Sequence, residues 1–290
     1  MQTISSALRN AINNGTPQRA LLVFNDREFS NEDIVLGTGI SINEEFNSAE
    51  DLTIGTCPSS IIQFTLLNDR QQLSNFNFGW FNAYLGAMVQ DDDEPGESEI
   101  VRVFTEHGVS RKYIFAPLGI FYAEKPTVIA QKKISVTAYD QMIVFESNIP
   151  NAETLGISYP TTIGAIMDSI CTIFNVTFDS DGFMNADLEV ESEPEEFQQA
   201  KTRDVIGWIA ECACSIARFT REGHLEFAWF TNTGTEFTEH NYSAFSPAWY
   251  ETNPINGLYL RDTNDGTESS VGASKTNNYL IMNNPFLREV

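Results

Sequence analysis

The spacing of apolar residues changes along the chain, and each change predicts a different kind of element. Near the start, Leu8 and Ala11 lie three residues apart, which is the spacing of one helix face. Ser5 or Ser6 can cap the first turn of such a helix, and Asn14-Gly15 is a stop signal. The pattern therefore predicts a short amphipathic helix that opens the chain.

Strand patterns follow this helix. Residues 61–67 are rich in apolar and β-branched side chains, which favours a strand. At Ile134, Val136 and Ala138 apolar side chains alternate with polar ones, and such alternation places all three on one face of a strand. We expect this first part of the chain to be β.

Between Asn68 and Arg111 the pattern loosens. The run of acidic and turn-forming residues at 91–97 cannot pack in a core, and we expect it to form an exposed loop. The sequence thus predicts a loop region, at about residues 70–110, inserted into the first β domain.

The middle of the chain has helical spacing. Apolar residues recur over Ile163–Phe174 at intervals of three and four, with Thr161 or Thr162 as the cap. A second apolar helix is expected after a cap at Thr202, and it leads into a β-hairpin with its turn at Arg221–Gly223. The residues expected on the buried face of this hairpin are Leu225, Phe227 and Trp229.

Beyond Thr231 the pattern is mixed. A polar, turn-rich loop is expected at Asp262–Ser274, between strand-like segments at 255–262 and 277–287. The pattern as a whole predicts a β-rich α+β protein. Its expected parts are a first β domain at 1–148, a helical linking region at 149–215 and a second β domain at 216–290.

Composition and charge exclude some classes of protein. Hydrophobic residues make up 42% of the chain and aromatic residues 12%, which is far from the signature of disorder. Lysine and arginine total 17 against 40 acidic residues, a net charge of −23. Nucleic-acid binding and docking on an anionic membrane are both disfavoured, because each depends mainly on basic side chains. No segment resembles a signal peptide or a membrane span, so we expect a protein made and kept in the cytosol.

The residues suited to chemistry are few. Histidine-dependent catalysis would rest on His107, His224 or His240, and we expect the first two at the surface. The chain has no nucleophile elbow, zinc-protease motif or calcium-loop pattern, and its glycines form no phosphate-binding fingerprint. We therefore predict no catalytic, cofactor-binding or metal-binding residue.

The four cysteines are expected to be buried free thiols. They are Cys57, Cys171, Cys212 and Cys214, and their spacing fits no disulfide framework. Cys212 and Cys214 lie two residues apart on the expected helix, where only residues three or four apart are neighbours. A metal site at this pair is therefore not expected.

Six segments carry a resemblance to a known family through their joint order and separations. The segments are DLTIGTCPSSIIQFTLLN at 51–68, APLGIFYAEKP at 116–126, KKISVTAYDQM at 132–142, ISYPTTIGAIMDSICTIFNV at 157–176, TRDVIGWIAECACSIARFTREGHLEF at 202–227 and NNYLIMNNPFL at 277–287. Together they resemble the tail-hub proteins of phages and prophages of Gram-positive bacteria. That family is related to contractile-tail baseplate hubs and to the N-terminal part of tail-associated lysins. The resemblance covers about the last five-sixths of the chain.

The resemblance implies two tail-tube-like β-barrel domains with smaller helical and α+β insertions, and a homotrimer. Three copies of two similar barrels would form a pseudo-sixfold ring, which joins a sixfold tail tube to a threefold tip and lines the DNA conduit. The implied place is the tail tip of a virion, assembled in the host cytoplasm. The implied partners are a distal tail or tail tube protein, the tape-measure protein and, in some relatives, a tail fibre or lysin.

Relatives commonly continue past the segment that corresponds to 277–287, so either the chain is a minimal hub or its second β domain is incomplete at the C-terminus. Two alternatives to the hub stay open. The chain could be the anchoring module of a tail-associated peptidoglycan hydrolase, whose catalytic domain would lie downstream. It could also be a glycan-binding receptor module, which needs aromatic side chains gathered at the surface, whereas the four tryptophans lie mostly in core-like contexts. They are Trp80, Trp208, Trp229 and Trp249.

Overall fold

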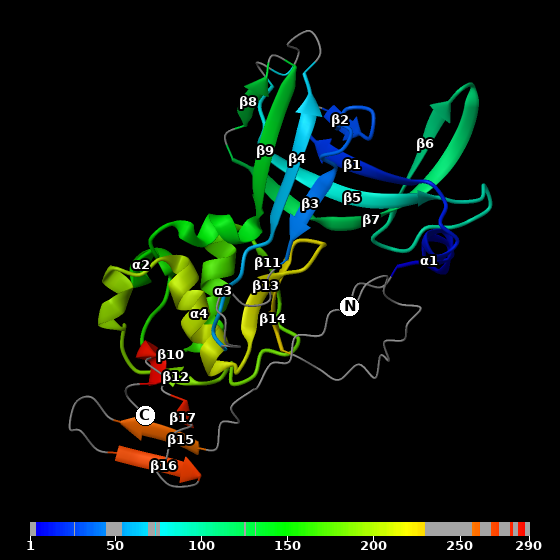
Figure 1. Ribbon diagram of the computed structural model, residues 1–290. Helices are drawn as coiled ribbons and strands as arrows, with labels where there is room; N and C mark the ends of the chain where they lie inside the picture. The colour runs from blue at the N-terminus through cyan, green and yellow to red at the C-terminus, as the bar shows by residue number, and fades with distance from the viewer. Residues whose placement is uncertain are drawn as a thin grey trace.

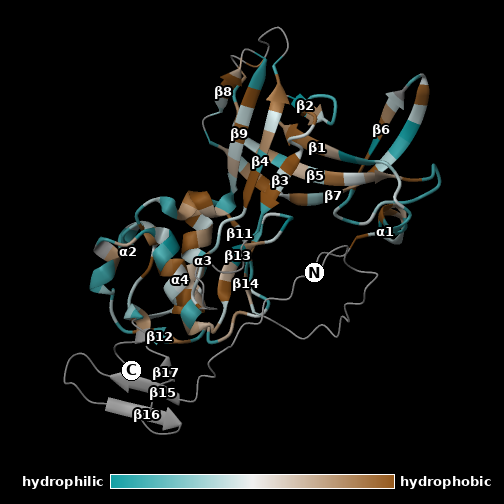
Figure 2. Cartoon of the chain, viewed as in Figure 1, coloured by the Kyte–Doolittle hydropathy of each residue, from teal (hydrophilic) through white to brown (hydrophobic). Residues whose placement is uncertain are grey.

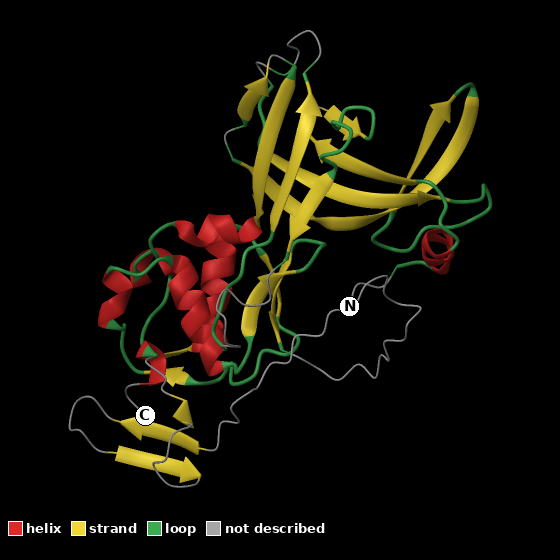
Figure 3. Ribbon diagram, in the orientation of Figure 1, coloured by secondary structure: helices red, strands yellow, loops and turns green. Residues whose placement is uncertain are grey.

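The protein, seen in a computed structural model, has two units joined side by side (Figures 1 and 3). We call them the sheet unit, which runs from α1 to β9, and the helical unit, which runs from η2 to β14. No described helix is long and apolar enough to cross a membrane. The structure describes residues 4–25, 27–44, 54–68, 73, 76–124, 126–130, 132–229, 257–261, 268–272, 279–280 and 284–287.

The sheet unit is one nine-stranded sheet with a helix on one face. The path of paired strands is β2-β1-β5-β7-β9-β4-β3, with β6 added to β7 and β8 added to β9. All pairs in it are antiparallel. Its elements are α1 (Ser6–Asn13), β1 (Gln18–Phe24), β2 (Arg27–Ser30), β3 (Ile40–Asn43), β4 (Ile61–Leu67), β5 (Trp80–Met88), β6 (Ile100–Glu106), β7 (Val109–Ala123), β8 (Thr127–Ala130) and β9 (Lys133–Asp140).

This sheet is rolled, although among the described residues no strand ladder closes it into a barrel. The chain just after β2 reaches across to the end of β4. There the N–H of Val35 donates to the carbonyl of Thr65 at 2.9 Å, and the N–H of Leu67 donates to the carbonyl of Asp33 at 2.7 Å. The roll encloses a phenylalanine-rich core, in which the ring of Phe24 stacks on that of Phe81 at 4.5 Å. Strand β9 presents Ile134, Val136 and Ala138 to this core, as the alternation predicts.

The predicted loop region at 70–110 is wrong for most of its length. Strands β5 and β6 lie within it, and β7 begins directly after it. Strand β5 lacks a clean alternation because both of its faces are covered, one by the core of the roll and the other by α1 and the β6–β7 hairpin. Packing on both faces is tight at Gly86 of this strand, because a Cβ there would lie 2.5 Å from the ring of Phe115. The acidic segment 91–97 is a loop as predicted.

The helical unit packs two helices against a small three-stranded sheet, in which β14 pairs with β13 and β11. Figure 2 shows apolar stretches along both long helices. The hairpin with its turn at 221–223 is confirmed, with Leu225 and Phe227 buried. The elements are η2 (Gln141–Glu146), α2 (Ala152–Leu155), β10 (Thr161–Thr162), α3 (Ile163–Phe174), β11 (Thr177–Asp179), β12 (Glu189–Val190), η3 (Glu195–Gln198), α4 (Thr202–Cys212), β13 (Ile216–Phe219) and β14 (His224–Ala228).

The helix caps follow the sequence with one exception. Ser5 accepts a hydrogen bond from the N–H of Leu8, and Thr162 accepts one from the N–H of Ala165. The predicted cap at Thr202 is wrong, because Thr202 is the first residue inside α4. Its hydroxyl donates to the carbonyl of Ser147 instead, which ties the start of α4 to the chain that leaves η2.

The C-terminal part differs from the prediction. Strands β15 (Gly257–Arg261), β16 (Glu268–Gly272) and β17 (Tyr279–Leu280) form a separate small sheet. Strand β16 lies inside the predicted loop at Asp262–Ser274, where serines and a glycine hid the strand pattern. The segment 277–287 is not one continuous strand, since β17 is short and Pro285–Leu287 form the 3-10 turn η4.

Candidate functional site

The junction between the two units is built around a strap, residues 54–57, that leaves the sheet unit and crosses the helical unit. The strap hydrogen bonds to the segment that connects α4 to β13. The N–H of Gly55 donates to the carbonyl of Ser215 at 2.8 Å, and the N–H of Ala217 donates to the carbonyl of Thr56 at 3.0 Å. The chain then returns to the sheet unit as β4. A segment far from the helices in sequence therefore completes the helical unit.

The strap can lie this close to α4 because glycines face each other across the contact. A Cβ on Gly207 would lie 2.8 Å from the carbonyl oxygen of Gly55, and one on Gly55 would lie 2.8 Å from the Cβ of Glu211. Both distances are shorter than side-chain carbons tolerate, so each position requires glycine.

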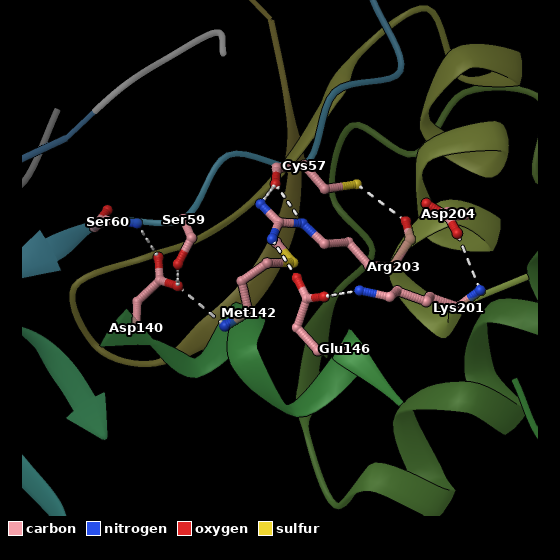
Figure 4. Close-up of polar contacts among 9 residues, drawn as sticks. All are labelled: Cys57, Ser59, Ser60, Asp140, Met142, Glu146, Lys201, Arg203 and Asp204. Carbon is pink, nitrogen blue, oxygen red and sulfur yellow. Dashed lines mark hydrogen bonds and ion pairs between the residues drawn. The ribbon is translucent and has the colours of Figure 1, made fainter. Parts of the chain in front are cut away.

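A cluster of charged side chains fixes the strap to the start of α4 (Figure 4). Arg203 donates to the carbonyl of Cys57 from two guanidinium nitrogens, one of them at 2.9 Å, and to the carboxylate of Glu146 at 2.6 Å. Lys201 donates to the other oxygen of Glu146 at 2.6 Å. The hydrogen bonds from Lys201 and then Arg203 lower the pKa of Glu146. This cluster joins the strap, η2 and α4 at one place.

Asp140 holds a second point of the junction, at the end of β9 (Figure 4). Its carboxylate is buried and accepts hydrogen bonds from the hydroxyl of Ser59 at 2.7 Å, the N–H of Ser60 at 2.8 Å and the N–H of Met142 at 3.1 Å. Burial raises the pKa of this carboxyl, and the three hydrogen bonds act in the opposite direction. Asp140 thus couples the return of the strap to the first turn of η2.

The C-terminal residues Asn284 and Phe286 pack against α4, and we call them the plug. Phe286 is buried against the rings of Phe197 and Trp208, with centroid distances of 5.7 and 6.4 Å. The side-chain amide of Asn284 donates to the carbonyl of Trp208 at 2.7 Å and to the carboxylate of Glu211 at 2.9 Å. The chain therefore leaves the helical unit after β14 and comes back to close its core.

The strap and α4 line an open cleft of about 530 Å³. Its charged groups have partners within the chain, since Arg203 binds Glu146, Asp204 accepts from the N–H of Lys201 and Glu211 accepts from Asn284. Burial raises the pKa of Glu211. The arrangement is that of a structural joint, with paired charges and tight backbone contacts.

Three of the four cysteines have little thiolate character. Burial raises the pKa of Cys57, Cys171 and Cys212 to about 12, so at neutral pH these three are thiols, which are weak nucleophiles. The expectation of four buried thiols is confirmed for Cys171 and Cys212, whereas Cys57 is partly buried and Cys214 is exposed. Cys214 lies just beyond the end of α4, with a left-handed backbone that turns its side chain outward.

His107 and His224 lie at the surface, as expected. His107 is exposed in the turn between β6 and β7, and His224 is exposed at the first position of β14. His240 lies outside the described residues. In the described part of the chain, no three side chains of His, Cys, Asp or Glu are grouped as a metal site.

One aromatic pair departs from the core-like context expected for tryptophan. Trp80 and Tyr122 lie opposite each other on β5 and β7, with ring centroids 5.2 Å apart. Their exposed fractions are 38% and 39%, so the pair lies at the surface of the sheet unit. Trp229 is also 40% exposed, Trp208 is partly buried, and Trp249 lies outside the described residues.

Sequence reasoning missed the residues of the joint. Two local signals were present: Asp140 follows an alternating strand and precedes Gln141 and Met142 as an Asx cap would, and Asn284-Pro285 is a turn signal. The pairing of Gly55 with Gly207 left no local signal, because it depends on how the strap crosses α4.

Comparison with known proteins bears on the fold. No protein-family model matches the chain, and no curated protein matches it by sequence. The tail protein from Neisseria meningitidis MC58 superposes with a TM-score of 0.52 at 7% identity, over 93% of this chain and 72% of that one. The 43 kDa tail protein of prophage MuSo2 from Shewanella oneidensis superposes with a TM-score of 0.48 at 11% identity, over 91% and 71%. The chain shares the fold of the Neisseria tail protein.

Proposed function

We propose that this chain is a structural protein of a bacteriophage-type tail and acts as its hub. The observation that carries the proposal is the fold shared with the Neisseria tail protein over 93% of the chain. The order of six segments that resemble tail-hub proteins supports it independently of the fold.

The hub proposal extends to assembly. Three copies would form a ring of two tube-like β-barrel domains each, at the tail tip, where it joins the sixfold tube to a threefold tip. The partners would be a second and third copy, the tube or distal tail protein and the tape-measure protein. The rolled sheet of the sheet unit supports the first barrel, and the joint supports a rigid link from it to the helical unit.

We propose a structural role and not a catalytic one. The three thiols with a pKa raised to about 12 support this, as does the exposure of His107 and His224 at the surface. The alternative is that this chain is the anchoring module of a peptidoglycan hydrolase, whose catalytic domain would belong to a longer gene product. The exposed Trp80–Tyr122 pair is the feature that favours glycan binding instead.

The test is to locate the protein in particles from the organism that encodes it. Immunogold labelling of purified tails should mark one tip of each tail, and deletion of the gene should give particles without an assembled tip. Label along the whole tail would contradict the hub, and absence from tails would contradict the tail role. Clearing of cell walls by the purified protein, or glycan binding lost in Trp80→Ala, would favour the alternatives.

A further inference from the structure

Strand β8 is an apolar strand at the edge of the sheet unit. Among the described residues it pairs only with β9, so its other edge has no described strand partner. All four of its residues are exposed, with Val128 at 64% and Ile129 at 56% (Figure 2). Folded proteins usually protect a free edge with charges or proline, because an apolar edge pairs readily with other chains. Two exposed apolar side chains on such an edge, here Val128 and Ile129, indicate an interface.

Basic side chains lie next to this edge. Lys132 and Lys133 are consecutive and exposed where the chain turns from β8 into β9. The nearest exposed carboxylate along the described sequence is that of Glu124, just before β8, because Asp140 at the end of β9 is buried. In a chain with 17 basic and 40 acidic residues, two exposed lysines beside an apolar strand form a local basic surface. We call Val128, Ile129, Lys132 and Lys133 the β8 surface.

The opposite end of the molecule is acidic. Figure 1 places β8 at one extreme of the two units and β12 near the other. The segment 187–196 contains β12 and the first two residues of η3, and the chain has no lysine or arginine between Asp179 and Ala200. The exposed carboxylates of this segment are Asp187, Glu189, Glu191, Glu193 and Glu195.

We propose that the β8 surface binds the acidic segment 187–196 of a second copy of this chain. The contact would be head to tail, because its two halves lie at opposite ends of one molecule. A contact of this kind closes into a ring when its rotation permits and otherwise extends as a filament. The lysines would select the acidic segment, and Val128 and Ile129 would supply the apolar area. The inference deepens the proposed assembly of the hub, on which it rests.

Charge reversal tests the pairing. The variants Lys132→Glu with Lys133→Glu, and Glu191→Lys with Glu193→Lys, should each raise the dissociation constant of self-association about tenfold or more in sedimentation velocity. A chain that carries all four changes should regain association, because the reversed charges again face opposite signs. All four changed residues are exposed, so circular dichroism and melting temperature should stay unchanged.

The apolar part is tested with a matched control. Val128→Asp should weaken self-association, whereas Val103→Asp on β6, where the valine is 62% exposed, should not. A wild-type protein that stays monomeric at every concentration would overturn the inference, and so would equal effects at both valines or no rescue by the four changes. If the protein is found in tails but these changes leave its self-association unaltered, the β8 contact is refuted and the tail role is not. A protein that associates through β8 yet is absent from tails would refute the tail role alone.

Discussion

Three helices of the helical unit end in the same way, with different residues at the key position. A left-handed residue follows each helix: Gly156 directly after α2, Asn175 directly after α3, and Cys214 two residues after the end of α4. In each case the N–H of this residue and the N–H of the next residue donate to carbonyls of the last turn. This is a Schellman motif, which favours glycine and tolerates asparagine. Cysteine carries the steric cost of its Cβ.

We therefore expect Cys214→Gly to stabilise the protein. Relief of the left-handed strain, less the added freedom of glycine in the unfolded chain, should raise the free energy of unfolding by about 0.5–1 kcal/mol. Urea denaturation measures this. Cys214→Ala is the control, because it removes the thiol and keeps the Cβ. An equal gain from alanine would mean that the thiol, and not the backbone, is the source of the cost.

Arg19 is the buried partner of an acidic residue in the sheet unit. Its guanidinium donates to both carboxylate oxygens of Glu32, at 2.7 and 2.9 Å, and lies 4.4 Å from the centre of the Phe104 ring. The hydrogen bond from Arg19 lowers the pKa of Glu32 from 4.5 to about 2. Glu32 itself remains 60% exposed, so solvent screens the pair.

This pair predicts part of the acid sensitivity of the fold. A carboxyl whose pKa is lower in the folded state stabilises the protein above its unfolded pKa of 4.5, and this contribution is lost as the pH falls toward about 2. Glu32→Gln should flatten the pH dependence of unfolding in that window, by about 1 kcal/mol or less because of screening. Denaturant melts from pH 6 to pH 2 would show it. Arg19→Met should flatten the same window, and an unchanged slope in both variants would contradict the assignment.

At the scale of elements, the contact of the strap with α4 depends on Gly207. Gly207→Ala would gain helix propensity of about 1 kcal/mol, but its Cβ would meet a backbone oxygen that cannot move without shifting the strap. We expect a net loss of about 1–2 kcal/mol in the free energy of unfolding. Gly79→Ala is the control, since a Cβ there meets nothing within 4 Å. A stabilised Gly207→Ala variant would show that the strap does not press on α4.

The plug predicts that the C-terminus stabilises a distant helix. Phe286→Ala should cost about 3 kcal/mol, because a buried aromatic ring leaves a cavity between Phe197 and Trp208. Hydrogen exchange of the α4 amides should accelerate in this variant. Ile173→Ala is the control, since Ile173 is a partly exposed aliphatic residue of α3. Unchanged protection of α4 would mean that the plug is not part of the helical core.

The elements with one exposed face could be predicted from sequence, and those covered on both faces could not. Strand β9 and helix α3 have the expected alternation and spacing because one face of each meets water. Strand β5 lies between two apolar layers, so its alternation is lost and it resembled a loop. The joint could not be predicted because Gly55, Glu146 and Arg203 meet only after folding.

At the scale of the whole molecule, the core of the helical unit extends across both predicted domain boundaries, the one before residue 149 and the one after residue 215. It includes Met142 and Phe145, which precede 149, and Ala217, Leu225 and Phe227, which follow 215. It also takes in Cys57 from the strap and Phe286 from the plug. A segment cut at those boundaries would lack parts of its own core. The two units should therefore depend on each other for stability.

We expect the sheet unit and the helical unit to unfold in one cooperative transition, with calorimetric and van't Hoff enthalpies that agree. Arg203→Met removes the bonds to the Cys57 carbonyl and to Glu146, at a cost of about 2 kcal/mol, and should separate the two units into two transitions. Arg102→Met is the matched control, because Arg102 pairs with Glu28 within the sheet unit, away from the strap. It should leave one transition. Two transitions in the unmodified protein would show that the strap and Asp140 do not couple the units.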